Sequence, residues 1–348
     1  MKKFDYLCAR CVGKFLNGTE WLMKTTVPTK SKGLKKQLNI SYGEHKNQRM
    51  DFFYLPQVSD EKRPIFFYIH GGGFVSGLTS MRRPFCAQMA KQGYFVVNID
   101  YRPAPLIHFP EHFNDIFKAV DFVLERGEEY NLDISRIVIG GESAGAYFSS
   151  YIAAMTKDKS LYLQNNIDFR WKNEFNLSAV VLINGAYKSA DIIKVKSAFS
   201  KTFIKAFFDF NRAGLRDSNI LNENKLHCPL NFIDSNFPPT VVIRGKYDIF
   251  DLGSKSIIEV FEKQNVKHSV FLAKGMAGLH AGTIAMNFKY SKKALQFITE
   301  KLNEFIKSDI WFCLLQKNII FIAIKKLIKC KYLWHMEIVY EKYDRYFG

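Results

Sequence analysis

Cysteine is scarce in this chain, and the few cysteines are scattered. Six cysteines in 348 residues are too few for the disulfide framework of a small secreted protein. Cys8 and Cys11 form one C-x-x-C, but no second pair follows at zinc-ligand spacing and no βαβ pattern surrounds it. We therefore expect reduced thiols, no metal site and a cytoplasmic protein.

Long uninterrupted apolar runs are also missing. Asp5, Arg10 and Lys14 interrupt the apolar core that a signal peptide needs, so we do not expect secretion. Residues 310–328 are apolar but contain lysines, and they fall short of the roughly 20 apolar residues of a spanning helix. For residues 309–348 we favour a helix packed on its own domain or on a second copy in a homodimer. The alternative is a helix lying on a membrane surface.

Acidic residues are few compared with basic ones. The chain has 33 Asp and Glu against 50 Lys and Arg, a formal net charge of +17. Such a charge suits nucleic acid, an anionic membrane, acidic substrates or simply a lysine-rich solvated surface. No zinc-ligand pairs and no aromatic RNA-binding strand accompany it, so we expect no nucleic-acid partner. The apolar content of 47% indicates a globular protein with a sizeable core.

Apolar runs that predict buried strands alternate with helical patterns. This alternation, with glycine-rich turns at strand ends, predicts a doubly wound, mostly parallel α/β sheet. The predicted strands are residues 37–42, 51–55, 64–70, 94–101, 137–139, 178–184, 239–244 and 268–272. The predicted helices are residues 111–126, 147–155, 252–264 and 290–307.

Two segments interrupt the alternation. Residues 1–36 are basic and mildly amphipathic, with apolar residues spaced as in one or two short helices. Residues 186–236 are rich in phenylalanine and lysine and too long for an ordinary connection. Together they predict a helical cap on one domain of residues 1–308, which the extension of residues 309–348 follows.

The sequence between a predicted strand and a predicted helix reads Gly141-Glu142-Ser143-Ala144-Gly145. The glycines permit a strained turn that presents the Ser143 hydroxyl, and the helix that follows points its amides at the same place. Alone, the pentapeptide is weak evidence, because a simple Gly/Ser turn between a strand and a helix also explains it. We interpret Ser143 as a nucleophile because other motifs accompany it.

A glycine-rich segment, His70-Gly71-Gly72-Gly73-Phe74, follows a buried strand. Ester hydrolysis creates a negatively charged oxygen, which needs backbone N–H donors about 3 Å away. Glycines let the main chain approach that oxygen closely. We assign Gly71, Gly72 and Ala144 as the donors, with Gly73 as a further candidate.

An acid and a histidine follow later strands. Asp248 lies nearest a strand end, where α/β sheets place functional loops, while Asp251 has the alternative role of a helix N-cap. His280 lies in a glycine-flanked loop after the last predicted strand. A carboxylate that orients an imidazole, which activates a hydroxyl, is the logic of a catalytic triad. We assign Asp248 and His280 to it.

The motifs HGGGF, DYRPAP, GESAG, YDIFD and LHAG, in this order over roughly residues 50–305, resemble the hormone-sensitive-lipase-like branch of α/β-hydrolases. That branch includes bacterial acetyl esterases and arylacetamide deacetylase-like enzymes. The resemblance implies an α/β-hydrolase fold with a cap, the triad Ser143, Asp248 and His280, and no cofactor or metal. Pro103, Leu106 and the Ala281-Gly282 pair depart from the usual pattern, which puts the substrate pocket in question.

These observations predict a serine carboxylic ester hydrolase. We expect it to cleave short- to medium-chain acyl or acetyl esters through an acyl-enzyme. Lysines of the cap are expected to steer anionic substrates, namely Lys188, Lys194, Lys196, Lys201 and Lys205. One alternative is an amidase or formamidase that uses the same triad. Another is a non-catalytic small-molecule-binding protein of the same fold, but the resemblance implies that such proteins usually lack the histidine, and His280 is present.

Overall fold

The structure of the protein is a computed structural model that describes residues 3–24, 32–57, 60–165, 167, 176–195, 199–209 and 225–306. The chain divides into two compact units, Met1–Leu302 and Asn303–Gly348. The sheet and the sites discussed below lie in the first unit. The predicted extension, residues 309–348, lies outside the described residues, as do residues 210–224 of the predicted cap.

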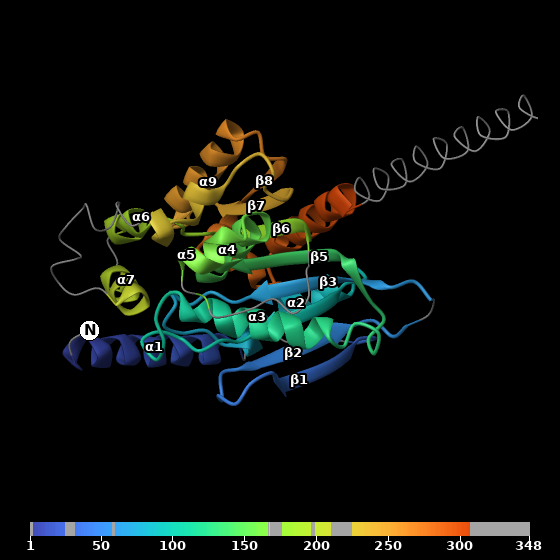
Figure 1. Ribbon diagram of the computed structural model, residues 1–348, viewed down its shortest axis with the longest axis horizontal. Coiled ribbons are helices and arrows are strands. Elements are labelled where there is room, and N and C mark those ends of the chain that lie inside the picture. Colours follow the sequence, from blue (N-terminus) through green and yellow to red (C-terminus); the bar gives the residue numbers. More distant parts are fainter. Residues whose placement is uncertain are drawn as a thin grey trace, which may run out of the picture. The chain divides into compact units, whose positions relative to one another are not determined.

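Within the described residues, eight strands form one sheet in the order β1-β2-β4-β3-β5-β6-β7-β8 (Figure 1). β2 pairs antiparallel with β1 and β4, and all other pairs are parallel. All the predicted strands are present, so the predicted fold class is confirmed. The strands are β1 (Lys35–Ser41), β2 (Arg49–Tyr54), β3 (Arg63–Ile69), β4 (Phe95–Ile99), β5 (Leu132–Glu142), β6 (Leu177–Ile183), β7 (Thr240–Gly245) and β8 (His268–Ala273).

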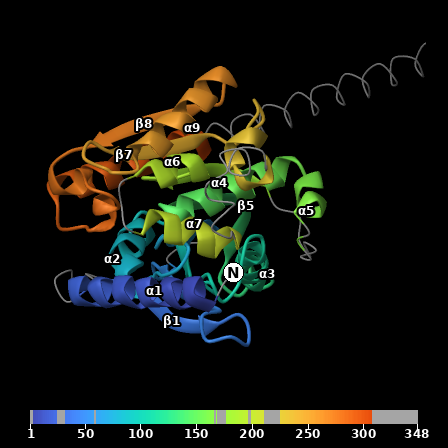
Figure 2. The ribbon, with the colours of Figure 1, turned by 90° about the vertical axis from the view of Figure 1, so that its left-hand side faces the viewer.

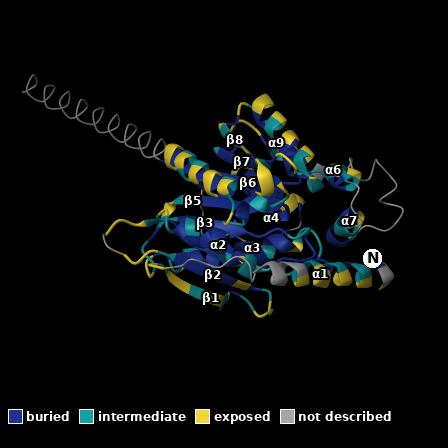
Figure 3. Ribbon diagram, turned by 180° about the vertical axis from the view of Figure 1, so that it is seen from behind, coloured by how far each residue is buried: buried dark blue, intermediate teal, exposed yellow. Residues whose placement is uncertain are grey.

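Helices connect the strands and flank the sheet. The central strands are buried, whereas the helices are exposed along their outer faces only (Figure 3). The α-helices are α1 (Lys3–Lys24), α2 (Thr79–Ala90), α3 (Glu111–Leu124), α4 (Ala144–Lys157), α5 (Ser160–Gln164), α6 (Ser189–Lys194), α7 (Ser200–Phe208) and α9 (Asp251–Lys263), and residues 289–306 are also helical. The short 3-10 helices are η1 (Lys225–His227), η2 (Pro229–Phe232), η3 (Gly275–Gly278) and η4 (Gly282–Ile284).

Helices cover both faces of the sheet, as a doubly wound fold requires. Side chains of a strand alternate between the two faces. On β3, Tyr68 packs on Phe85 of α2, with ring centroids 5.1 Å apart, while its neighbour Phe67 belongs to the core that also holds Phe113 of α3 and Phe148 of α4. Figure 2 accordingly shows α2 and α3 on opposite sides of the sheet.

The helix α2 is absent from the sequence-based prediction. Its segment contains Pro84, which removes a backbone donor and normally disfavours a helix interior. Phe85, Cys86, Ala87 and Met89 are nevertheless buried in α2. Burial against the sheet therefore outweighs the local preference of proline against a helix. A local sequence pattern does not reveal this burial.

The two segments that interrupt the alternation contact each other. The first forms one helix, α1, and the second contributes α6 and α7; all three lie at the same end of the sheet (Figures 1 and 2). Lys205 of α7 forms an ion pair with Asp5 of α1 at 3.1 Å. Ala9 of α1 and Ala206 of α7 share a small apolar cluster. These helices lie beside the end of the sheet that carries Ser143.

Candidate active site

Ser143 lies at the sharp turn between β5, which ends at Glu142, and α4, which begins at Ala144. Its backbone has φ 55° and ψ −116°, a conformation that costs free energy in a residue with a side chain. A Cβ atom on Gly145 would stand 1.9 Å from the carbonyl oxygen of Ile69, so only glycine fits there. The strand, turn and helix that the sequence predicted are therefore in place around the Ser143 hydroxyl.

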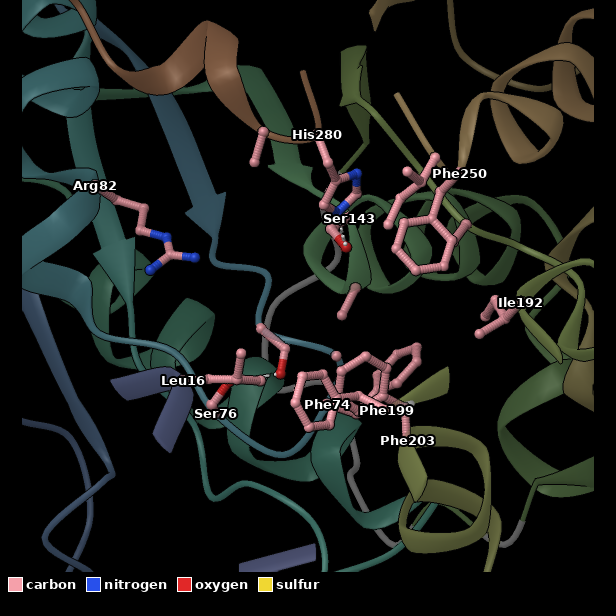
Figure 4. Close-up of a pocket in the computed structure, with 16 residues that line it drawn as sticks. Leu16, Phe74, Ser76, Arg82, Ser143, Ile192, Phe199, Phe203, Phe250 and His280 are labelled. Carbon is pink, nitrogen blue, oxygen red and sulfur yellow. Dashed lines mark hydrogen bonds between the residues drawn. The ribbon is translucent and has the colours of Figure 1, made fainter. Parts of the chain in front are cut away.

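The structure brings the predicted histidine and acid to this serine. His280 Nε2 lies 2.9 Å from Ser143 Oγ, and His280 Nδ1 lies 2.8 Å from Asp248 Oδ1. Figure 4 shows the imidazole of His280 pointing at Ser143. A carboxylate can only accept a hydrogen bond, so the neutral imidazole carries its hydrogen on Nδ1 and donates it to Asp248. Nε2 is then free of hydrogen and accepts the hydrogen bond from the Ser143 hydroxyl. This arrangement can withdraw a proton from Ser143.

The carboxylate of Asp248 is held by several donors. Besides His280, Asn184 Nδ2 donates to Oδ2 at 2.7 Å and the Phe250 amide donates to Oδ1 at 2.9 Å. Burial raises the pKa of Asp248, but the hydrogen bond and charge of His280 and these further donors outweigh it, so the net pKa is lowered. Asp248 is therefore ionised at neutral pH. Sequence reasoning missed Asn184, which follows β6 and lies far from Asp248 in the chain.

Asp251, the alternative acid, forms an ion pair away from His280. It is the first residue of α9, and the N-cap is Phe250, so the predicted N-cap role of Asp251 is wrong. Its carboxylate instead binds Arg244, with Arg244 Nη2 2.6 Å from Oδ2. The helix starts one residue earlier than a cap at Asp251 requires, and the Asp251 carboxylate pairs with Arg244 near the end of β7.

The glycine-rich segment requires a correction. The Gly71 amide donates to Glu142 Oε1 at 2.7 Å, so its predicted role as a donor to a substrate oxygen does not fit. The amides of Gly72 and Gly73, with φ of 124° and 60°, donate to no described residue. Ala144 is the first residue of α4, so its amide has no acceptor within the helix. These three amides are the ones available to an oxyanion.

Glu142 joins the glycine-rich segment to the serine turn. It is fully buried, and its Oε1 accepts from Gly71 and from Arg82 Nε at 2.7 Å, while Tyr68 donates to Oε2 at 2.6 Å. Burial, and then the charge of Glu142, raise the pKa of Tyr68. Sequence reasoning missed this network because Arg82 lies on the unpredicted helix α2. The only local signal was an acid at the end of an apolar strand.

A cavity of about 260 Å³ opens beside Ser143 and His280. Its walls are mostly apolar and aromatic, and come from α1, the glycine-rich segment, α6, α7 and the loop before α9 (Figure 4). A smaller cavity of about 190 Å³ shares Ala186, Ile192, Ile249 and Phe250 with it and includes Lys194. The larger cavity is lined by Leu16, Gly72, Gly73, Phe74, Ser76, Arg82, Ser143, Ala144, Ala186, Ile192, Phe199, Phe203, Ile249, Phe250, His280 and Ala281.

Of the lysines expected to steer anionic substrates, Lys205 is engaged in the ion pair with Asp5. Lys194 lines the smaller cavity, and Lys196 lies outside the described residues. The steering role stays a prediction. Over the described ranges, no three histidine, cysteine or acidic side chains gather in a way that suits a metal ion. None of the helices described combines the length and apolar character needed to cross a membrane.

Comparison with known proteins agrees with this architecture. Esterase LipI of Mycobacterium tuberculosis (strain ATCC 25618 / H37Rv) is 34% identical over 108 residues, covering 30% of this chain and 34% of that protein. The probable isoprenylcysteine alpha-carbonyl methylesterase ICMEL1 of Arabidopsis thaliana is 26% identical over 248 residues, covering 68% of this chain and 49% of that protein. The chain thus spans about a third to a half of the length of these curated relatives.

Among solved structures, esterase B from Lactobacillus rhamnosis (HN001) superposes with a TM-score of 0.76 at 18% identity, covering 87% of this chain and 96% of that one. At this identity the likeness shows the fold. The model of the BD-FAE family matches residues 50–254, more than half of the chain, including the glycine-rich segment, Ser143 and Asp248. The chain therefore belongs to the BD-FAE family, a hormone-sensitive-lipase-like family of α/β-hydrolases.

Proposed function

We propose that this protein is a serine carboxylic ester hydrolase. The observation that carries the proposal is the hydrogen-bonded chain from Asp248 through His280 to Ser143 at the wall of an apolar cavity. The esterase names of its relatives and its family membership support the same conclusion.

The geometry supports a two-step reaction. Ser143 Oγ attacks the acyl carbonyl while His280 Nε2 takes its proton, and Asp248 stabilises the imidazolium that forms. His280 then gives this proton to the leaving alcohol, which leaves an acyl group on Ser143. In the second step His280 removes a proton from water while the water oxygen attacks the acyl carbon. His280 then returns this proton to Ser143 Oγ as the bond between Oγ and the acyl carbon breaks, which releases the acid.

The negative oxygen of each tetrahedral intermediate needs donors that are already in place. We assign this role to the amides of Gly72, Gly73 and Ala144. Glu142 supports it indirectly, because it holds Gly71 by a charge-assisted hydrogen bond of 2.7 Å and so fixes the start of the segment.

The size and lining of the cavity favour short- to medium-chain acyl groups. A volume of about 260 Å³ suits a small ligand group, and Phe199 and Phe203 of the α6–α7 region, together with Leu16 of α1, form its far wall. The space beside Gly73 is particularly restricted, since a Cβ atom there would stand 2.8 Å from the ring of Phe203. We therefore expect activity to fall for acyl chains too long to fold into this space.

The test is hydrolysis of p-nitrophenyl esters with acyl chains of about two to sixteen carbons. We expect the highest kcat/KM at the short end, and Ser143→Ala to lower turnover roughly 10⁴–10⁶-fold. Ser160→Ala, which changes an exposed serine outside the cavity, is the matched control and should leave turnover unchanged. Near-normal activity in Ser143→Ala would refute the nucleophile.

The two alternatives predict different profiles. An amidase would hydrolyse acyl anilides with kcat/KM at least as high as that of the matching esters. A binding protein would saturate with the esters, as seen by a rise in melting temperature, without releasing p-nitrophenol. The hydrogen bond of 2.9 Å between His280 and Ser143 favours the catalytic outcome, because a binding protein does not need it.

A further inference from the structure

A second cavity of about 260 Å³ shares no lining residue with the one beside Ser143. Four parts of the first unit converge on it: α1, the turn between β1 and β2, Val75 of the glycine-rich segment, and the loop of residues 103–106. It is lined by Tyr6, Arg10, Gly13, Lys14, Asn17, His45, Lys46, Asn47, Val75, Pro103, Ala104, Pro105 and Leu106. We refer to it as the basic cavity.

The charges that line the basic cavity have one sign. Arg10, Lys14 and Lys46 all line it, no carboxylate does, and none of the three forms an ion pair with a described residue. Asp5, which precedes Arg10 on α1, is engaged with Lys205. Three cations in one concave site repel one another, so an anion that binds among them relieves this repulsion.

Two polar side chains of the basic cavity also present donors. Asn17 Oδ1 accepts from the Gly77 amide at 2.9 Å, which fixes the oxygen there and leaves the Nδ2 hydrogens without a described acceptor. His45 Nδ1 is 3.1 Å from the Asn47 amide and accepts from it, so in the neutral ring the hydrogen lies on Nε2. Cations and N–H donors without a carboxylate match an oxyanion.

The remaining wall of the basic cavity is apolar. Val75, Ala104 and the two prolines lie there, and Leu106 is 50% exposed. A ligand that fills the site therefore has an oxyanion group and an apolar part. Among oxyanions, a phosphate monoester carries about −1.5 to −2 charges at neutral pH, and the guanidinium of Arg10 can donate to two of its oxygens.

We propose that the basic cavity binds the phosphate group of an amphiphilic phosphate ester. The same chemistry is presented by a soluble alkyl phosphate and by the headgroup of an anionic lipid. The site shares no lining residue with the catalytic cavity, so binding there needs no ester hydrolysis.

A bound phosphate fastens α1 to the body of the domain. Gly13 of α1 lies so close to Val75 that a Cβ atom would stand 2.4 Å from the Val75 carbonyl oxygen, and Asn17 holds Gly77 by the hydrogen bond given above. One turn away, Leu16 lines the catalytic cavity. A ligand that bridges Arg10 and Lys14 to Lys46 on the β1–β2 turn therefore adds a second attachment for this wall of the catalytic cavity.

The experiment uses the full chain with Ser143→Ala, so that no probe is hydrolysed at the catalytic serine. Hexyl phosphate, inorganic phosphate and hexanol are titrated separately by calorimetry, and the melting temperature is followed in parallel. We expect hexyl phosphate to bind, hexanol to fail, and the affinity for hexyl phosphate to fall as salt is raised. Failure of hexyl phosphate and of the vesicles described below would overturn the proposal, whatever the esterase assay shows.

Matched charge variants locate the binding. Arg10→Gln/Lys14→Gln should raise the dissociation constant of hexyl phosphate at least tenfold. Lys263→Gln/Lys292→Gln removes two exposed cations elsewhere and should leave it unchanged. Equal losses in both pairs would show that binding follows the net charge of +17 rather than a site, and would refute the proposal.

Vesicles distinguish the two sources of the phosphate. Flotation is measured with vesicles of phosphatidylcholine alone and with added phosphatidic acid. Binding to phosphatidic acid that needs Arg10 and Lys14, with no binding of hexyl phosphate, identifies a lipid headgroup. Binding of hexyl phosphate that also needs them identifies a site open to soluble esters. Vesicle binding that persists unchanged in Arg10→Gln/Lys14→Gln, with hexyl phosphate inactive, contradicts the site.

Discussion

Replacing Glu142 by glutamine tests the network that joins the glycine-rich segment to the serine turn. The Glu142 side chain has no exposure and that of Arg82 has 5%. Glu142→Gln keeps the shape but leaves the guanidinium of Arg82 buried without its counter-charge. Removing one partner of a buried ion pair costs about 3–5 kcal/mol, because the other charge stays desolvated. We expect a loss of this size in the free energy of unfolding.

The same substitution should affect the proposed catalysis. The Gly71 amide would lose a charged acceptor, so the neighbouring amides of Gly72 and Gly73 would be less well fixed. Because these amides act on the transition state and not on the ground state, kcat should fall by about tenfold or more while KM changes little. A variant that binds substrate less well but turns it over normally would argue against this role.

The assay is urea unfolding followed by fluorescence, together with p-nitrophenyl acetate kinetics on the same preparations. Glu142→Gln/Arg82→Met removes both charges, and we expect it to be more stable than Glu142→Gln alone by about 2 kcal/mol, since no unpaired cation stays buried. Two results would refute the proposed cost of burying Arg82 without Glu142. One is a Glu142→Gln variant that unfolds at the same urea concentration as the wild type. The other is an Arg82→Met substitution that lowers the free energy of unfolding of Glu142→Gln further.

Three further predictions concern the acid, a buried histidine and the cavity wall. Asp248→Asn should lower kcat about 10⁴-fold with little change in melting temperature, because an amide can donate to His280 Nδ1 and so favours the wrong tautomer; a loss below tenfold would argue against the triad. Burial lowers the pKa of His112 from 6.5 to about 3. At a pH between these two values, His112 is therefore protonated in the unfolded chain and neutral in the folded one. The contribution of His112 to the free energy of unfolding should therefore fall by about 2 kcal/mol between pH 7 and pH 5, and urea titrations should show this component missing in His112→Phe. Phe203→Ala should shift the preferred acyl chain of the p-nitrophenyl esters to greater length, and an unchanged profile would exclude Phe203 as the limiting wall.

Much of the fold was predictable because its central strands are buried on both faces. Runs such as residues 65–69 and 179–183 are continuously apolar, which few other structures accommodate. The helix α2 was not predictable in the same way. Its segment contains Pro84, and it is the contact of Phe85 with Tyr68 across the chain that favours the helix. Local patterns report local preferences, and α2 depends on a long-range contact.

The sequence by itself determined which residues of the site are chemically special. The glycines around Ser143, the acid at a strand end and the glycine-flanked His280 are required by backbone geometry and charge, and such requirements leave local signals. Only the tertiary structure decided between neighbours of the same kind. Gly71 and Gly73 are indistinguishable in a run of glycines, but the Gly71 amide donates a hydrogen bond to the carboxylate of Glu142 and the Gly73 amide does not. Asp248 and Asp251 differ because one meets His280 and the other meets Arg244. Hydrogen bonds depend on atomic positions a few ångströms apart, and those positions are set by segments that are distant in the chain.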